Sequence, residues 1–335
     1  MAAPPPSASE PLIDATSLAR FEAGLARAVG NGAHSTPLAL AVSGGPDSMA
    51  MLALAAAARP GRVIAATFDH GLRPASAAEA AMVADWCAAR AIPHATLHPD
   101  RPLPASNVQA SARTARYAAL GRWAAAAGAT LLATAHHADD QAETFLMRAN
   151  RGSGPTGLAG IRRARPLCAG VTLVRPLLDW RRATLAAIAA HLPVADDPSN
   201  ADAHYTRVRA RQWLAATPEL DPAQFARAAD HVATMADDLE ALAEWAWQTR
   251  RAAGDALAID VDGLPRALRR LLVRRAIAAG RAAAAIDTPD FGPAANVESL
   301  LDALERGRRA TQAGVVVTPR GTVWHVAAAP PRRTG

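Results

Sequence analysis

Residues 43–48, SGGPDS, combine residue types that suit phosphate binding. Two glycines let backbone N–H groups approach phosphate oxygens, and a helix starting here would add its positive N-terminal end. Ser43 and Ser48 can donate hydroxyl hydrogen bonds, whereas Asp47 would repel phosphate and is expected to hold Mg²⁺ or to orient a neighbour. The alternative is a plain strand-to-helix turn. The expected nucleotide contacts are Ser43, Gly44, Gly45, Pro46, Asp47 and Ser48.

The loop lacks the lysine of the common GxxxxGK[ST] nucleotide motif. All 36 basic residues of the 335-residue chain are arginine, so no lysine can serve as nucleophile, Schiff base or phosphate anchor. The net charge of +6 and the pI of about 10.6 are compatible with a polyanionic partner such as RNA. A coding bias toward alanine and arginine explains the same composition.

A second polar segment, HHADDQAET, covers residues 136–144. Asp140 and Glu143 are three residues apart at the predicted start of a helix, where they share one face. Two carboxylates there can form a capping box without any ligand, or they can take part in a functional site. His136 and His137 are adjacent and point to opposite sides, so they do not form a metal pair.

Other arginines could clamp anions. Arg113 and Arg116 are three apart on one predicted helix face, which is either a solvated surface or a clamp for the α-phosphate. Residues 151–167 form a loop rich in glycine and arginine that is suited to following RNA phosphates, although charge runs are usually only solvated faces.

Alternating strands and helices must position these groups. Short apolar runs predict strands at residues 38–42, 62–68, 95–98 and 130–135, and alanine-rich helices begin near residues 48, 76 and 106. This alternation predicts a parallel, Rossmann-like sheet with helices on both faces and ligands at the carboxyl ends of the strands. Asp69 and His70 end the second strand, where adenine and ribose would lie.

Beyond residue 152 the pattern changes. Helices are predicted from about residue 205, over 221–253, over 265–280 and over 296–306, with two strand-like runs at 314–318 and 322–326. We therefore divide the chain into a proline-rich disordered leader (1–20), an α/β catalytic domain (21–217) and a smaller, mostly helical domain (218–335).

Cysteine content and hydropathy restrict the remaining classes. Cys87 and Cys168 lie 81 residues apart, which excludes a CxxC motif and a disulfide framework and favours a reducing cytoplasm. No stretch of ~20 uninterrupted apolar residues predicts a membrane span. The N-terminus lacks the features of a secretory signal.

SGGPDS resembles the PP-loop, SGGxDS, of the N-type ATP pyrophosphatases, which cleave ATP between the α- and β-phosphates. Further segments resemble the tRNA(Ile)-lysidine synthases in the order of that family and span about 170 residues. They are FDHGLRP (68–74), SNVQASARTARYAAL (106–120), ATAHHADDQAETFLMRANRGSGPTGLAG (133–160), RPLLDWRRATL (175–185) and DDPSNADAHYTRVRARQWL (196–214).

The resemblance implies a PP-loop fold of the adenine nucleotide alpha-hydrolase-like type. It implies that ATP, with Mg²⁺, adenylates carbon-2 oxygen of the wobble cytidine in the CAU anticodon of tRNA(Ile), and that free L-lysine then displaces AMP. A homodimer is left open. The rival interpretations are a PP-loop tRNA sulfurtransferase, which needs cysteines that stand in no such motif here, and a catalytically inactive RNA-binding module.

The resemblance also implies roles for individual residues. The expected catalytic residues are Asp47, Arg116, His136, Asp140 and Glu143, with Asp140 and Glu143 binding lysine. The expected RNA contacts are Arg73, Arg113, Arg148, Arg151, Arg162, Arg163, Arg207, Arg209 and Arg211.

Two departures from the family pattern are visible. The usual YxRNRIR is here YTRVRAR, with Val208 in place of asparagine and Ala210 in place of isoleucine, so the hydrogen bonds of that asparagine must be lost or replaced. The chain also ends soon after residue 326, which predicts a short form without the second C-terminal domain of longer members.

Overall fold

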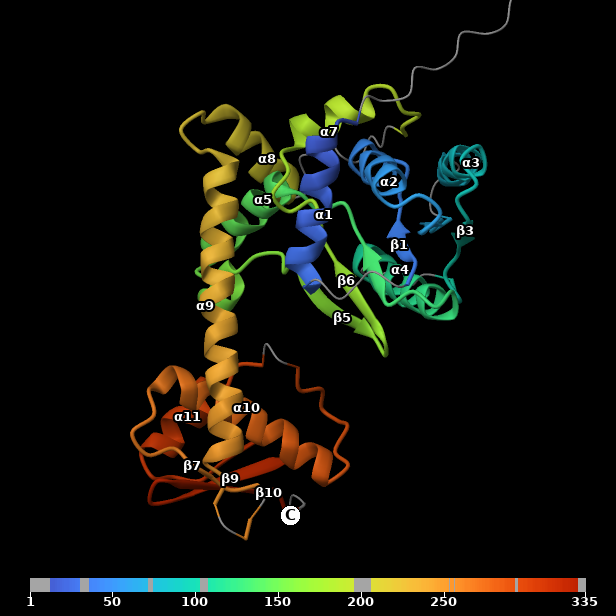
Figure 1. The fold of residues 1–335 in the computed structure, drawn as a ribbon. Helices are drawn as coiled ribbons and strands as arrows, with labels where there is room; N and C mark the ends of the chain where they lie inside the picture. The colour runs from blue at the N-terminus through green and yellow to red at the C-terminus, as the bar shows by residue number, and fades with distance from the viewer. Residues whose placement is uncertain are drawn as a thin grey trace, which may run out of the picture. The chain divides into compact units, whose positions relative to one another are not determined.

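The computed structural model describes residues 13–30, 36–71, 75–102, 108–195, 206–252, 254–255, 257–292 and 295–330 (Figure 1). The chain divides into two compact units, Met1–Ala233 and Thr234–Gly335. They meet inside a long helix, α9 (Pro222–Thr249), 16 residues beyond the boundary proposed from the sequence. Each unit is described separately below.

The first unit contains a six-stranded sheet in the order β3-β2-β1-β4-β6-β5. All neighbouring strands are parallel except β5, which is antiparallel to β6. The strands are β1 (Leu38–Ala41), β2 (Val63–Phe68), β3 (His94–Leu97), β4 (Leu131–Ala133), β5 (Ala164–Cys168) and β6 (Val171–Val174). The predicted parallel sheet is thus confirmed.

Helices cover both faces because the strands are apolar on both sides. In β1, Leu38 and Leu40 belong to one core cluster while Ala39 belongs to the other, as the two-residue period of a strand requires. The first cluster includes side chains of α1 (Ala15–Val29), α2 (Pro46–Ala58), α3 (Ala75–Ala88) and α7 (Arg182–Ala189); the second includes α4 (Val108–Ala126). Figure 1 shows α2 and α4 on opposite sides of β1.

The strand order places a topological switch between β1 and β4. The chain winds outward from β1 through β2 to β3, and then returns through α4 to β4 on the other side of β1. Parallel sheets of this kind bind ligands at the carboxyl ends of the two strands that flank the switch. SGGPDS follows β1, and the segment HHADDQAET follows β4, so the sheet brings both motifs to one edge.

Three more helices complete this unit and carry site residues. They are α5 (Ala138–Ala149), the short α6 (Pro155–Leu158) and α8 (Thr206–Ala216). The rings of Phe145 in α5 and Phe225 near the start of α9 lie 5.8 Å apart between centroids, so apolar contact as well as charge holds α9 to this unit.

The prediction of a disordered leader over residues 1–20 is wrong for residues 15–20, which belong to α1. Asp14 caps α1 by accepting a hydrogen bond from the Ser17 amide at 2.7 Å, and Phe21 and Leu25 are buried. The helix therefore starts at Ala15, inside the segment assigned to the leader. Residues 1–12 lie outside the described ranges.

Most of β5 falls within residues 151–167, which were predicted as a loop, and β6 was not predicted. Its first strand reads ARPLC, and proline is normally excluded from the interior of a sheet. Here Pro166 is tolerated because β5 is an edge strand whose register shifts between Pro166 and Cys168. The arginine and proline content of β5 therefore suggested a loop, whereas its position at the edge of the sheet allows a strand.

The second unit combines helices with a small antiparallel sheet in the order β7-β10-β9-β8. Its elements are β7 (Ile259–Asp260), α10 (Arg266–Ala283), α11 (Glu298–Glu305), β8 (Ala310–Gln312), β9 (Val315–Arg320) and β10 (Val323–Ala328). The helical character and the strands β9 and β10 were predicted, whereas β7 and β8 are too short to leave a periodic signal. Trp247, from the end of α9, lies in the core of this unit.

Among the described residues, no helix is both long enough and apolar enough to cross a membrane.

Candidate active site

The SGGPDS loop has the backbone geometry of a phosphate cradle. Gly44 has φ of +86°, a left-handed conformation that favours glycine, and Gly45 is the N-cap of α2 with Pro46 at the first helical position. The Ser48 hydroxyl donates to the Gly45 carbonyl at 2.9 Å and accepts from the Ser43 amide at 3.1 Å. Ser48 thus fixes the loop while the first amides of α2 remain directed out of the helix end.

Asp47 lies against His137, which links the two motifs across the switch. The Asp47 Oδ2 atom is 3.3 Å from His137 Nε2, while Asp47 Oδ1 is buried and has no hydrogen-bond partner among the described residues. His137 caps α5: its Nδ1 accepts from the Asp140 amide at 3.4 Å, and its own amide donates to Asp140 Oδ2 at 3.1 Å. His137 Nε2 therefore faces Asp47, and this buried nitrogen has no hydrogen-bond partner among the described residues.

The capping alternative considered for Asp140 and Glu143 therefore applies to a different pair. Asp140 does belong to a capping box, but its partner is His137 and not Glu143. A histidine in the N-cap position is uncommon, which is why the sequence did not indicate this pairing.

His136 lies near four guanidinium groups and stays neutral. Its Nδ1 atom is 3.0 Å from Thr134 Oγ1. Burial, followed by the charges of Arg175, Arg207 and Arg116, holds the pKa of His136 well below its usual range. At neutral pH this ring can offer hydrogen bonds but no positive charge.

Glu143 is the most completely buried carboxylate of the site, with 1 % of its side chain exposed. Its Oε1 atom accepts from Arg182 at 3.1 Å and from Arg211 at 2.9 Å, and its Oε2 atom accepts from Arg207 at 2.7 Å. Burial alone would raise the pKa of Glu143, but Arg207 and Arg211 more than offset this effect and lower it. The carboxylate is therefore ionised and ties together α5, α7 and α8.

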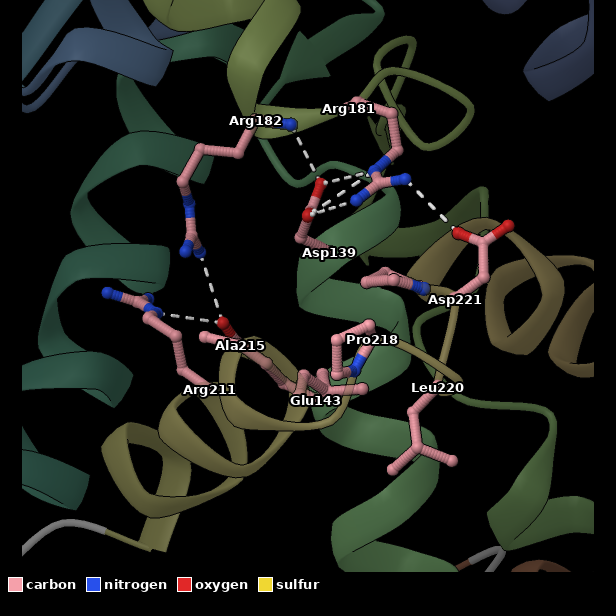
Figure 2. Close-up of a pocket in the computed structure, with 11 residues that line it drawn as sticks. Asp139, Glu143, Arg181, Arg182, Arg211, Ala215, Pro218, Leu220 and Asp221 are labelled. Atoms are coloured by element: carbon pink, nitrogen blue, oxygen red, sulfur yellow. Dashed lines mark hydrogen bonds and ion pairs between the residues drawn. The ribbon is translucent and has the colours of Figure 1, made fainter.

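Asp139 and Asp140 extend this network in two directions. Asp140 Oδ1 accepts from Arg207 at 2.6 Å, so Arg207 bridges Asp140 and Glu143. Asp139 accepts from the Arg182 amide at 2.7 Å and lies 3.3 Å from Arg181, which also reaches Asp221 at the start of α9. Figure 2 shows Asp139 pointing toward Arg181 and Glu143 pointing toward Arg182 and Arg211.

A pocket of about 410 Å³ lies beside this network (Figure 2). Carboxylates, guanidinium groups and apolar side chains line it together. The lining residues are Asp139, Glu143, Arg181, Arg182, Arg211, Leu214, Ala215, Pro218, Leu220, Asp221 and Pro222. Such a wall offers both signs of charge to one small molecule.

Asp69 has a structural partner at the end of β2. Its Oδ1 atom accepts from Ser76 Oγ at 2.6 Å and from the Gly71 amide at 2.8 Å. These hydrogen bonds, chiefly that of Ser76, lower the pKa of Asp69. The carboxylate therefore holds the turn into α3. His70 follows it, and contact of either residue with adenine or ribose stays a prediction.

The arginines predicted to bind RNA fall into three groups. Arg163, Arg207 and Arg211 are ion-paired with carboxylates. Arg148 and Arg162 donate to backbone carbonyls, Arg148 to Gly157 and Gly160 and Arg162 to Ala233. The others that the structure describes, which pair with no carboxylate within the described ranges, are Arg113, Arg151 and Arg209. Arg73 lies outside those ranges.

Sequence reasoning missed several residues of the site. Arg181 and Arg182 stand in the segment DWRRATL, which was noticed as part of the family pattern but given no role. Only the fold shows that the start of α7 faces Asp139 and Glu143. His137 was set aside in favour of its neighbour, although it is the histidine next to Asp47.

Residues 18–218 match a family model described as a PP-loop domain. Together with the loop geometry and the switch between β1 and β4, this match defines the chain as a PP-loop protein. A solved structure, the U34-tRNA thiolase of Methanococcus maripaludis with its [4Fe-4S] cluster, shares this fold with a TM-score of 0.54. The alignment covers 65 % of this chain and 78 % of that one at 16 % identity, which shows a common fold alone.

Three tRNA(Ile)-lysidine synthases are much more similar in sequence. That of Novosphingobium aromaticivorans is 44 % identical, covering 88 % of this chain and 90 % of the relative. That of Zymomonas mobilis is 38 % identical, covering 89 % of this chain and 90 % of the relative. That of a Methylobacterium species is 45 % identical, covering 76 % of this chain and 77 % of the relative. The chain belongs to the tRNA(Ile)-lysidine synthase family.

The first prediction concerns the charge of Glu143. A carboxylate with a lowered pKa stabilises the folded state fully above its unfolded pKa, ordinarily 4.5, and this stabilisation is lost as the pH falls through the lowered value. Replacing Glu143 by Gln removes the carboxylate that three guanidinium groups share, so Arg211 loses its carboxylate partner and Arg207 and Arg182 keep only Asp140. We expect Glu143→Gln to lower the free energy of unfolding by about 3 kcal/mol at pH 7, with a smaller difference toward pH ~3.

Urea titrations from pH 7 to pH ~3 measure this difference. Glu240→Gln is the control, because Glu240 is exposed on α9 and pairs with no described residue. A Glu143→Gln deficit that stays constant across the pH range would contradict the ionised, arginine-bound state.

Proposed function

We propose that this chain is a tRNA(Ile)-lysidine synthase that joins free L-lysine to carbon 2 of the wobble cytidine in the CAU anticodon of tRNA(Ile). In the first step the carbon-2 oxygen bonds to the α-phosphorus of ATP and pyrophosphate leaves. In the second step an amino group of lysine bonds to carbon 2, the carbon–oxygen bond breaks and AMP leaves. The modified base would read AUA instead of AUG.

The observation that carries the proposal is the meeting of two motifs at one switch point. The loop after β1 offers backbone amides to a leaving pyrophosphate, and the segment after β4 offers carboxylates to an amine. His137 joins them through Asp47. A reaction that first consumes ATP and then an amine needs both groups at one edge of the sheet.

Asp47 fits a magnesium ion that would accompany ATP. Its Oδ1 atom is buried without a partner, and Mg²⁺ accepts one or two carboxylates together with phosphate oxygens and water. The described residues contain no cluster of three or more metal-binding side chains, so substrate phosphates would complete the coordination. A bound ion would neutralise charge on the departing pyrophosphate.

Lysine can reach the carboxylates only if the arginines give way. Asp140 and Glu143 are both bound by Arg207, and the ammonium group of lysine would compete for the same oxygen atoms. RNA phosphates are the natural competitor for the arginines. We therefore propose that RNA binding draws Arg207, and with it Arg211, away from the carboxylates and opens the site to lysine.

The same exchange would make Glu143 a better proton acceptor. In the structure described here burial raises the pKa of Glu143 and the arginines lower it. Once the arginines move to phosphate groups, burial acts with less opposition and the pKa rises. A carboxylate with a higher pKa is better suited to remove a proton from the lysine ammonium at neutral pH.

The pocket beside Glu143 is the proposed entry for lysine. Free lysine carries both ammonium and carboxylate groups, and the pocket wall holds Asp139 and Glu143 together with Arg181 and Arg182. Leu214 and Leu220 can cover the aliphatic part of the substrate. We further propose that residues 218–335 form an RNA-binding domain.

The cysteines do not favour the rival sulfur-transfer reaction. Cys87 is buried in α3, where burial raises the pKa of its thiol to about 11, and Cys168 is exposed at the end of β5. A persulfide or an iron–sulfur cluster needs reactive or grouped thiolates.

Transfer of radiolabelled lysine to CAU-anticodon tRNA, in the presence of ATP and Mg²⁺, tests the function directly. We expect label on this tRNA and none on a tRNA with a different anticodon. Asp140→Asn should reduce transfer at least ~100-fold, because the amide keeps the capping hydrogen bond but cannot hold an ammonium group. Affinity for tRNA should change less than about threefold. Wild-type protein that labels no tRNA would refute the proposal.

Lysine access generates a separate prediction. Arg207→Gln removes the cation that bridges Asp140 and Glu143, so lysine should bind the RNA-free protein about fivefold more tightly, the size of one competing charge-assisted contact of ~1 kcal/mol. Affinity for RNA should fall. Calorimetric titration with lysine and a non-hydrolysable ATP analogue measures the first effect.

Arg209→Gln is the matched control on the same helix, because Arg209 is exposed and pairs with no carboxylate among the described residues. It should weaken RNA binding without changing lysine affinity. Equal lysine affinity in wild type and Arg207→Gln would argue against the exchange.

A further inference from the structure

Three guanidinium groups surround the ring of Tyr117. The Cζ atoms of Arg113, Arg116 and Arg165 lie 5.1, 5.1 and 5.2 Å from the centre of the ring. A fourth, Arg175, acts on the same tyrosine: burial raises the pKa of Tyr117, but the charges of Arg116, Arg113 and Arg175 together more than offset this and lower it. These arginines come from α4, β5 and the residue after β6, so the fold and not one charge run brings them together.

This arginine cluster, Arg113, Arg116, Arg165 and Arg175, has no counter-charge among the described residues. None of the four forms an ion pair with a carboxylate in the part of the chain that the structure describes. Arg165 and Arg175 instead donate to the carbonyls of Pro166 and Arg162. Around Glu143, by contrast, every arginine has a carboxylate partner. Like charges gathered in a partly buried site repel one another unless an anion joins them.

Several donors of the cluster are buried and unused. Arg175 is 4 % exposed and Tyr117 is 8 % exposed. The Nε atoms of Arg116 and Arg175 and the hydroxyl of Tyr117 have no hydrogen-bond partner among the described residues. Arg113 is exposed, so the cluster has an outer as well as a buried part. An anion with several oxygen atoms would satisfy these donors together.

Arg175 is separated from the phosphate loop by one strand of the sheet, β4. Arg175 follows β6, and the sheet order places β4 between β6 and β1, which leads into SGGPDS. The two adjacent histidines, His136 and His137, face these two different surroundings. The charges of Arg175 and Arg116 help to lower the pKa of His136, whereas His137 lies beside Asp47.

We propose that Arg113, Arg116, Arg165 and Arg175, with Tyr117, form a second phosphate subsite that takes one phosphodiester group of the RNA next to the target nucleotide. This inference rests on the proposed function. ATP is the other possible source of phosphate, but its triphosphate travels with Mg²⁺, and this cluster contains no carboxylate to hold a metal. A phosphodiester carries one charge and needs only cations and hydrogen-bond donors.

The test compares Arg165→Gln and Arg113→Gln with a control on the same helix as Arg113. Arg122→Gln serves as the control, since Arg122 is exposed and paired with Asp100. Binding of a CAU-anticodon stem-loop RNA is measured over a range of salt concentrations, and binding of a non-hydrolysable ATP analogue without RNA. Thermal unfolding shows that each variant is folded.

We expect each cluster variant to bind the RNA about tenfold more weakly and to lower the slope of log Kd against log salt by about 1. Affinity for the ATP analogue should stay within about twofold, and Arg122→Gln should change neither. Unchanged RNA affinity and slope in both cluster variants would overturn the subsite. Loss of ATP affinity with intact RNA binding would assign the cluster to ATP and overturn it as well.

If the proposed function itself is wrong, the experiments give a different result from the one that refutes the subsite alone. In that case the wild-type protein transfers no lysine to CAU-anticodon tRNA, whatever the variants bind. Normal lysine transfer by the wild type, with cluster variants that bind RNA as it does, would refute the subsite alone.

Discussion

A negative charge at Glu143, almost wholly removed from solvent, determines how the catalytic region is built. A lone buried carboxylate is costly, and here Arg182, Arg207 and Arg211 compensate it from two other helices. The three elements α5, α7 and α8 are thereby held at one end of the sheet. Guanidinium groups suit this task because their planar forks can bridge carboxylates, as Arg207 does between Glu143 and Asp140.

Some arginines of the site are paired with carboxylates and others are not, and this difference decides where an approaching anion is attracted. Near Glu143 the charges balance, whereas around Tyr117 four cations have no described counter-charge. A polyanion that approaches this edge of the sheet is attracted first to the unbalanced cluster. From there its phosphates can compete for Arg207. Arg207 is close enough to the cluster that its charge, like those of Arg175 and Arg116, lowers the pKa of His136. In the proposed function, two features that look independent in the sequence would be successive contacts of one RNA substrate.

Much of the fold follows from the sequence because local signals agree with tertiary demands. Alternating apolar runs gave β1 to β4, and Gly44 marked the loop because a left-handed residue is needed there. The hairpin of β5 was hidden by Pro166, which only an edge strand accepts. The motifs predicted which segments meet at the edge of the sheet, and the roles of their residues stay predictions. The pairing of Asp140 with His137, and of Glu143 with distant arginines, depends on how helices meet, which no short pattern encodes.

The exchange of arginine for lysine at the buried carboxylates is tested most directly by the affinity of wild-type protein for L-lysine. Calorimetric titrations with a non-hydrolysable ATP analogue are compared with and without saturating CAU-anticodon stem-loop RNA. If RNA withdraws the arginines, lysine binds at least ~10-fold more tightly when RNA is present, and by linkage RNA binds more tightly when lysine is present. Equal lysine affinity with and without RNA would contradict the exchange.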